Sequence, residues 1–434
     1  MTEITPDLVR PTFGEALRFW LKLGFISFGG PAGQIAIMHR EVVEKRRWVD
    51  EAHFLHALNF CMLLPGPEAQ QLATYLGWLL HRTWGGIVAG ALFVLPSAIL
   101  LWALSYVYLA FGNVLWVGGV FYGLKPAVLG IVASAVLRIG GKALKNEVMW
   151  SLAAAAFVAI FVFHVPFPAI IGAAAIIGWI GGKVRKEKFL VVKGHGGAKG
   201  TLTHDMAGHA TPTLGRALRV TAFCLALWWL PVLAVGAWLG WDGTHFQQGV
   251  FFSKAAMVTF GGAYAVLPYV AQQAVENHGW LSAPQMLDGL GLAETTPGPL
   301  IMVLQFVGFV GGWQHPGALP PLASATLGAL VTTWTTFVPC FLWIFLGAPY
   351  VERLRENERL TCALSAITAA VVGVVLNLAV WFGTQVLFPK AFQPDWFAVA
   401  VSVVAFAGLQ WWKWDVIPVV CGAGLLGMLV KALL

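Results

Sequence analysis

Charged residues are scarce in this chain: they make up 11% of its 434 residues, while 58% belong to the hydrophobic set. A soluble enzyme of this length needs much more polar surface, so the composition excludes that class and makes lipid the solvent. Apolar stretches approaching the length that crosses a bilayer recur along the chain. These stretches are Gly86–Ala110, Val148–Phe163, Ala169–Gly182, Ala217–Leu239, Leu322–Leu346, Leu360–Leu387, Phe397–Leu409 and Val416–Leu433. Composition therefore predicts an all-α polytopic membrane protein.

Signatures of cofactor and metal chemistry are missing. The cysteines form no CxxC pair and lie in or beside apolar segments, which predicts buried structural thiols and neither a disulfide framework nor a metal site; they are Cys61, Cys224, Cys340, Cys362 and Cys421. We recognise no Rossmann GxGxxG fingerprint, no haem-attachment CxxCH and no cluster of iron–sulfur cysteines. No cofactor is expected, and a membrane-bound reductase is disfavoured.

A removable signal peptide is not indicated either, because residues 1–15 contain Glu3, Asp7 and Glu15 and no short apolar core before a small-residue cleavage site. The net charge of +7 comes from basic residues in short loops, so it predicts membrane topology and no nucleic-acid partner. Seven tryptophans near the expected helix ends are interpreted as interfacial anchors: Trp228, Trp229, Trp238, Trp241, Trp411, Trp412 and Trp414.

Between Lys22 and Pro67 the chain matches its second half at a shift of 232 residues without any gap. The shift places Lys22 on Lys254, Phe28-Gly29-Gly30 on Phe260-Gly261-Gly262, Glu44 on Glu276, Trp48 on Trp280, and Pro65-Gly66-Pro67 on Pro297-Gly298-Pro299. Farther on the register drifts, and Pro96 and Gly130 meet Pro339 and Gly373. We therefore divide the chain into an N-terminal segment (1–15), a first repeat (16–182), a basic cytoplasmic linker (183–216), a linking transmembrane helix (217–243) and a second repeat (244–434).

Loop charges predict that the two repeats have opposite orientations. The loop Arg40–Arg47 carries four basic residues and its counterpart Gln272–Trp280 carries none, whereas short cytoplasmic loops are enriched in Lys and Arg. The same rule makes the other basic loops cytoplasmic: those with Arg138, Lys142 and Lys145, with Lys183–Lys199, with Arg353, Arg355 and Arg359, and with Lys413. The FGG and PGP segments are then predicted to be re-entrant hairpins, since broken backbone at membrane depth must be buried in protein or line a cavity. Full crossing by kinked helices is the alternative.

The helix breaks are the candidate binding site. Free N–H groups and the macrodipole at a half-helix N-terminus favour anions, and transporters with broken helices use them near the midplane. The candidates in the first repeat are Gly29, Gly30, Gly33, Pro65, Gly66 and Pro67. Those in the second are Gly261, Gly262, Pro297, Gly298 and Pro299. The alternative is that the breaks only relieve packing at hairpin tips.

Two lysines and two acids accompany the breaks. Lys22 and Lys254 each precede an FGG by six residues within apolar sequence, which predicts either an anion ligand or a snorkelling cation. Glu68 directly follows Pro67, so it is either a carrier of a coupling proton or a helix cap, and Glu294 is a second candidate. Four amides could add hydrogen bonds or join helices: Asn59, Gln70, Gln71 and Gln305.

Three other polar features are given structural interpretations. The Gly- and Thr-rich loop His195–His209 is interpreted as a linker and not as a metal site. Lys125 is expected to be an interfacial charge and Arg138 a cytoplasmic anchor.

These motifs resemble the long, two-halved form of the bacterial chromate ion transporters, over nearly the whole chain. The resemblance rests on SFGGPAGQIAIMHREVVEKRRWVD at 27–50, LLPGPEAQQLATYLGW at 63–78, and the later segments TFGGAYAVLPYV and ETTPGPL. It implies export of chromate across the bacterial inner membrane, driven by the proton motive force and conferring chromate resistance, with sulfate as a competitor. Ala263 stands where the first repeat has Pro31, and Leu300 where it has Glu68, so the two half-sites are expected to differ chemically.

Other activities of the same fold stay open at this point. A sulfate or oxyanion uptake carrier and an anion channel would both share the broken helices. The sequence leaves open the preference among chromate, sulfate and molybdate, the coupling ion and stoichiometry, and the oligomeric state, including a homodimer.

Overall fold

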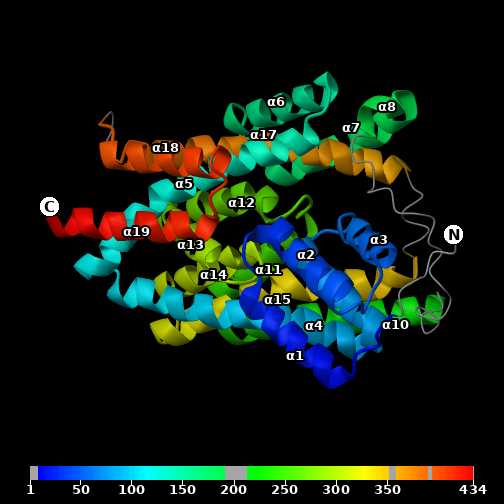
Figure 1. The fold of residues 1–434 in the computed structure, drawn as a ribbon. Coiled ribbons are helices and arrows are strands. Elements are labelled where there is room, and N and C mark those ends of the chain that lie inside the picture. Colours follow the sequence, from blue (N-terminus) through cyan, green and yellow to red (C-terminus); the bar gives the residue numbers. More distant parts are fainter. Residues whose placement is uncertain (1–7, 191–212, 351–357, 390–392, 434) are drawn as a thin grey trace.

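The computed structural model describes residues 8–190, 213–350, 358–389 and 393–433. These residues form helices and no β-strand (Figure 1). Among the described helices, seven are long and apolar enough to cross a membrane: α4 Glu68–Phe111, α5 Leu115–Ala143, α7 Phe167–Val184, α10 Leu214–Leu239, α15 Pro321–Gly347, α17 Glu358–Leu387 and α19 Val416–Leu433. The predicted all-α polytopic membrane class is confirmed. Glu3, Asp7, the loop His195–His209, Arg353 and Arg355 lie outside the described residues.

Shorter helices separate the long ones. In the first half they are α1 Phe13–Ile26, α2 Gly30–His39, the π-helical η1 Arg40–Lys45, α3 Glu51–Cys61, α6 Glu147–Phe161 and α8 Lys186–Phe189. In the second half they are α11 Thr244–Met257, α12 Ala263–Ala271, the π-helical η2 Gln272–Asn277, α13 Ala283–Thr295, the 3-10 turn η3 Leu300–Met302, α14 Val303–Gln314, the 3-10 turn η4 Ala348–Tyr350 and α18 Trp396–Gln410.

The two halves have the same order of elements with closely matching lengths. Helices α1 and α11 have 14 residues each, and the two π-helices have 6 each and differ in position by 232. Helices α6 and α18 have 15 residues each, and α7 and α19 have 18 each. Helix α4 fits this order because His81 and Arg82 leave helical backbone angles. It therefore consists of a short arm (68–80), matching η3 and α14, and a long part (83–111), matching α15.

Helix starts follow local sequence signals. The Asp50 side chain accepts a hydrogen bond from His53 N and caps α3, and Ser282, at the matching position of the other half, forms a capping box with Gln285 before α13. Thr12 and Glu15 form a capping box before α1. Side-chain caps are thus present at the starts of α1, α3 and α13. The helices after the FGG and PGP breaks begin without a side-chain cap.

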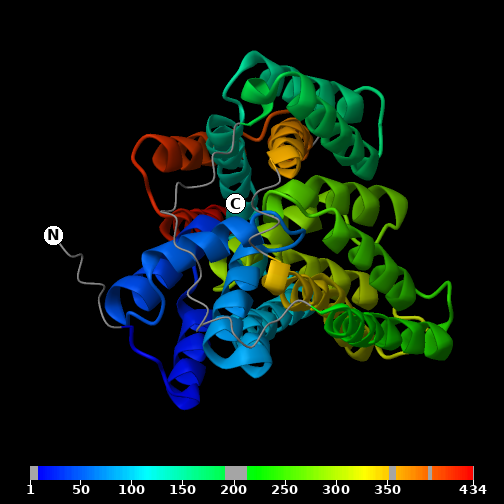
Figure 2. The same ribbon diagram turned by 90° about the vertical axis from the view of Figure 1, so that its right-hand side faces the viewer.

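The last helices of each half pack on the other half. Helices α18 and α19 lie on α5, and α6 and α7 lie on α17 (Figures 1 and 2). Small residues make this closeness possible: a Cβ at Gly123 would stand 1.9 Å from the Ala423 oxygen, and one at Gly427 would stand 2.3 Å from the Gly123 nitrogen. This packing corrects one expectation, because GxGxxG spacing does occur, as GAGLLG at 422–427. The motif lies inside α19 and serves helix contact, so it is no dinucleotide fingerprint.

Two further expectations are wrong in part. Trp228 is buried and its indole N–H donates to Ser253 Oγ at 2.9 Å, so it joins α10 to α11 and is no headgroup anchor. Cys421 is exposed, unlike the other four cysteines, which are buried as expected. In both cases helix rotation, which hydropathy does not report, decides what the side chain faces.

Candidate functional site

All six glycines of the FGG and PGP breaks have left-handed backbone. Their φ angles are +85° and +67° at Gly29 and Gly30, +124° at Gly66, +80° and +94° at Gly261 and Gly262, and +102° at Gly298. Side chains rarely tolerate this region, so glycine is needed to turn the chain here. A helix begins directly after each break, namely α2, the short arm of α4, α12 and η3 with α14. Each break thus presents unpaired N–H groups at a helix N-terminus.

Two hydrogen bonds between the halves join the four breaks in two pairs. Gly66 N donates to the Thr259 oxygen at 2.7 Å, and Gly298 N donates to the Ser27 oxygen at 2.7 Å. The two bonds are equivalent under the 232-residue shift, because Ser27 matches Thr259 and Gly66 matches Gly298. Each PGP break is therefore held against the FGG break of the opposite half. We call these four breaks the central breaks.

Side chains close around the central breaks. Gln34 Nε2 donates to the Gly298 oxygen at 2.5 Å, and Gln71 Nε2 donates to the Pro65 oxygen at 2.8 Å. A Cβ on Gly298 would stand 2.6 Å from Ser97 Cβ, and one on Gly66 would stand 2.9 Å from Cys340 Sγ. Sequence reasoning named Gln71 but missed Gln34, Ser97 and Cys340. A signal existed, since Ser97 and Cys340 each follow one of the aligned prolines, Pro96 and Pro339.

Two carboxylates stand beside the PGP breaks. Glu68 is half-buried and makes no hydrogen bond or ion pair within the part of the chain that the structure describes, and Lys142 on α5 acts on it electrostatically. Glu294 accepts a hydrogen bond from the Tyr264 hydroxyl, and Arg138 on α5 acts on both groups. Arg138 and Lys142 are exposed and lie one helical turn apart. Arg138 therefore belongs to this network and is more than the cytoplasmic anchor we expected.

The two predicted lysine ligands lie in the last turns of the helices that precede the FGG breaks, Lys22 in α1 and Lys254 in α11. Lys22 and Lys254 are exposed and make no hydrogen bond or ion pair among the described residues. Lys22 acts electrostatically on Glu41, which comes eleven residues after Gly30, about 16 Å along a helix. Lys254 acts on His278, beyond the far end of α12. No contact joins the two lysines among the described residues, and their role as anion ligands stays a prediction.

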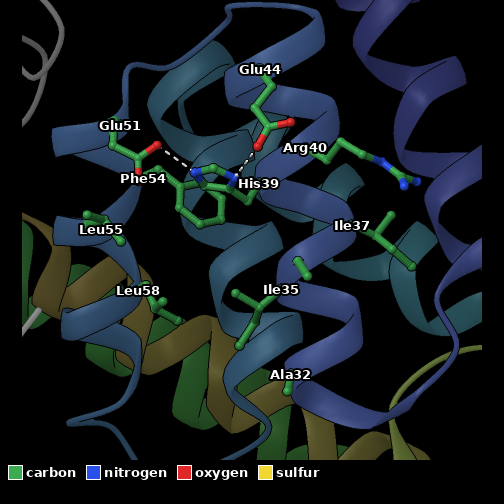
Figure 3. Close-up of a pocket in the computed structure, with 11 residues that line it drawn as sticks. Ala32, Ile35, Ile37, His39, Arg40, Glu44, Glu51, Phe54, Leu55 and Leu58 are labelled. Carbon is green, nitrogen blue, oxygen red and sulfur yellow. Dashed lines mark hydrogen bonds and ion pairs between the residues drawn. The ribbon is translucent and has the colours of Figure 1, made fainter. Parts of the chain in front are cut away.

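A groove of about 540 Å³ lies between α2 and α3 (Figure 3). It runs from Ala32, just after the first break, to the rim formed by His39, Glu44 and Glu51. The two His39 ring nitrogens lie 3.3 Å from the Glu44 carboxylate and 2.5 Å from the Glu51 carboxylate. Two carboxylates at the rim repel an anion, so the groove is a poor path to the site. The His39–Glu51 pair joins α2 to α3, and the His39–Glu44 pair joins α2 to η1.

The basic loop beside this groove is fixed by a buried acid. Glu41 Oε1 accepts a hydrogen bond from Lys45 at 2.7 Å, which lowers the pKa of the Glu41 carboxyl from its ordinary value. Arg46 lies 3.8 Å from the other oxygen and places its guanidinium over the rings of Phe19 and Trp48. Arg46 is thereby held against the middle of α1, and Glu41 holds Lys45 and Arg46 together.

Comparison with known proteins assigns both halves of the chain to the same family. A family model described as chromate transporter matches residues 14–179 and 246–428. A chromate transport protein of Pseudomonas aeruginosa is 32% identical across 99% of this chain and 95% of its own length. One of Cupriavidus metallidurans is 29% identical across 98% and 94%, and an uncharacterized transporter of Methanocaldococcus jannaschii is 24% identical across 95% and 92%. No solved structure matches the chain significantly.

Proposed function

Because the chain belongs to the chromate transporter family, we propose that it is a secondary active transporter that exports chromate across the bacterial inner membrane, driven by the proton motive force. Sulfate, which has the same tetrahedral shape and charge, is the proposed competitor. The observation that carries the proposal is the pairing of each PGP break with the FGG break of the opposite half. Two of these breaks come from each half of the chain.

The central breaks suit a dianion with four oxygen acceptors. Helix N-termini offer N–H donors and a positive dipole end without a fixed countercharge, so they bind an anion without holding it as tightly as a buried ion pair would. Arg138 and Lys142 add positive potential beside the PGP breaks. We assign the anion site to the six break glycines, with Gly33 and the flanking prolines Pro65, Pro67, Pro297 and Pro299 shaping the helix starts.

The inverted, re-entrant arrangement is part of the proposal and gains support from helix lengths. Helix α1 rises about 21 Å over its 14 residues, and α3 rises about 17 Å over its 11, whereas the hydrocarbon core is about 30 Å thick. The helices flanking each break are thus long enough to reach the middle and return. Such a pair of inverted repeats can expose a central site to each side in turn.

The test is transport of labelled chromate into inverted membrane vesicles that contain the protein. Export in the cell becomes uptake here, so we expect saturable accumulation when the vesicle interior is made acid and positive, and inhibition by excess sulfate. Vesicles without the protein are the control. A flux that does not saturate and cannot be driven uphill would show a channel. Faster proton-driven accumulation in right-side-out vesicles would show an uptake carrier.

A further inference from the structure

A buried charge cluster lies apart from the central breaks. Lys125 Nζ on α5 stands 3.4 Å from Asp288 Oδ2 on α13, and the Tyr108 hydroxyl on α4 donates to the same oxygen at 2.8 Å. Asp288 is only 2% exposed, while the Lys125 side chain is 30% exposed. Lys125 is therefore not the simple interfacial charge that we expected. The cluster joins two helices of the first half to one helix of the second.

The repeated architecture does not itself require this cluster. Asp288 matches His56 under the 232-residue shift, and Lys125 matches Thr368 under the later shift that aligns Gly130 with Gly373. The equivalent positions thus hold a histidine and a threonine where the cluster has an acid and a lysine. An ionisable group at membrane depth is costly and marks a functional site by default. Because the Lys125–Asp288 pair has no counterpart at the matching positions, we look for a function that is specific to this place in the fold.

One oxygen of the buried acid is free. Asp288 Oδ1 is buried and has no hydrogen-bond partner among the described residues, while Oδ2 holds both Tyr108 and Lys125. Helix α13 also packs against α14, α17 and α19, and the charged or titratable groups that act on Asp288 are Lys125 and Tyr108. A proton can therefore sit on Oδ1 without displacing either partner.

The cluster lies between the PGP break of the second half and one end of the molecule. Helix α13 begins beside the 314–320 loop, since His315 Nε2 is 3.0 Å from the Gly279 oxygen and the Gln314 side chain bonds Gln285 at 3.1 Å. Asp288 is five residues into α13, and Glu294 at the break is six residues farther on. This end is the extracellular one in the proposed topology.

Helix α5 carries three cations, each facing an acid. Lys125 pairs with Asp288, Arg138 acts on Tyr264 and Glu294, and Lys142 acts on Glu68; these pairs follow one another along the helix from its start to its end. Asp288 thus lies on the extracellular side of two other acids, Glu294 and Glu68, which stand beside the PGP breaks.

We propose that Asp288 is a proton-binding site of the transport cycle, with Lys125 as its countercharge; this rests on the proton-driven transport proposed above. The coupling proton binds to Oδ1 and leaves from it. When the proton is absent, the ammonium of Lys125 neutralises the carboxylate, and when it is present on Oδ1, Lys125 and Tyr108 keep their places at Oδ2. No covalent bond other than that to the proton forms or breaks.

The test compares purified protein in liposomes: wild type, Asp288→Asn, the double variant Asp288→Asn with Lys125→Gln, and Asp395→Asn. Two activities are measured, chromate-for-chromate exchange at equal pH and chromate accumulation driven by a pH gradient, with an internal dye recording proton flux. Asp395→Asn is the matched control, because Asp395 also accepts from a tyrosine of α5, Tyr122 at 2.8 Å, but caps α18 and pairs with no lysine of the described residues. Asparagine caps equally well, so this variant should resemble wild type.

We expect both Asp288 variants to keep exchange within about threefold of wild type and to lose gradient-driven accumulation and proton flux at least tenfold. The single variant leaves Lys125 without its countercharge and could misfold for that reason. The double variant removes this lysine as well, so it separates loss of coupling from loss of folding. Coupled accumulation by the double variant would show a structural ion pair and overturn the proposal, and so would loss of exchange in both variants. If wild type itself ignores the pH gradient, the proposed coupling to protons fails, and the assignment of Asp288 fails with it.

Discussion

Six glycines give the backbone of the proposed site its conformation. Each has a positive φ, and the amide nitrogens of two of them, Gly66 and Gly298, donate across the pseudo-symmetric centre. The side chains around them are amides, small residues and acids, so the positive potential comes from helix ends and from α5. Two side chains named from the sequence can be tested singly.

Glu68 is the acid directly after the first PGP break. Glu68→Gln keeps the size of the side chain but cannot release a proton, so we expect exchange of chromate for chromate to persist while proton-driven accumulation is lost. Both fluxes are measured in liposomes, with the exposed loop acid Glu276→Gln as the control. Undiminished uphill transport by Glu68→Gln would leave this residue with the role of a helix cap.

Lys254 tests whether the lysines before the FGG breaks reach the anion. A hydrogen bond to a charged group contributes about 1.5–3 kcal/mol, so a direct ligand predicts that Lys254→Gln weakens chromate affinity about ten- to a hundredfold. Lys254→Arg keeps the charge and should do less damage to affinity. Lys22→Gln should behave like Lys254→Gln if the symmetry is functional.

The measurement is the concentration dependence of chromate transport at matched expression. Lys145→Gln is the control, because this exposed lysine bonds the Gly141 carbonyl at 2.5 Å and has no role in the proposed site. An unchanged concentration dependence in Lys254→Gln would exclude a ligand role.

Among the secondary-structure elements, the helices that begin at the breaks form the proposed anion site. Their starts carry no side-chain cap, which leaves the first N–H groups for a ligand. The fit around each start is tight, as the contacts of Gly66 with Cys340 and of Gly298 with Ser97 show. Moving one start by the width of a methyl group should therefore disturb the site.

Gly298→Ala tests that tightness. The new Cβ would stand 2.6 Å from Ser97 Cβ, at a φ of +102° that costs a side chain about 1–3 kcal/mol. We expect a lower midpoint of thermal unfolding and at least a tenfold loss of transport, and Ser97→Gly in the same chain should restore part of the stability. Gly141→Ala, where nothing lies within 4 Å, should leave both measurements near wild type. Full transport by Gly298→Ala would show that the break has no part in binding.

In the whole molecule, each half packs its last helices on the other half. The end helices of each half pack on a long helix of the other, and the breaks bond across the centre, so neither half builds the site alone. If one half moves relative to the other during transport, as proposed, the end helices that pack on the opposite half must move with that half. The proposed inversion fixes which loops face each side.

Labelling of single cysteines tests the inversion. Glu44 and Glu276 occupy matching positions and are both exposed, the Glu44 side chain at 58%. In a background of Cys421→Ser, which removes the exposed native thiol, Glu44→Cys should react with an impermeant thiol reagent only from the cytoplasm and Glu276→Cys only from outside. Intact spheroplasts and inverted vesicles give the two sides. Reaction of both positions from one side would rule out opposite orientations.

The sequence by itself determined the class of protein, the 232-residue repeat and the positions of the breaks, because hydropathy and the need for glycine at positive φ are local properties. It also indicated Glu68, Glu294 and Gln71 near the breaks. Only the tertiary structure decided which break meets which, that Ser97 and Cys340 close on Gly298 and Gly66, and that Lys125 pairs with Asp288. These contacts join residues from opposite halves, so they depend on how the helices rotate and cross, which the pattern along one chain does not contain.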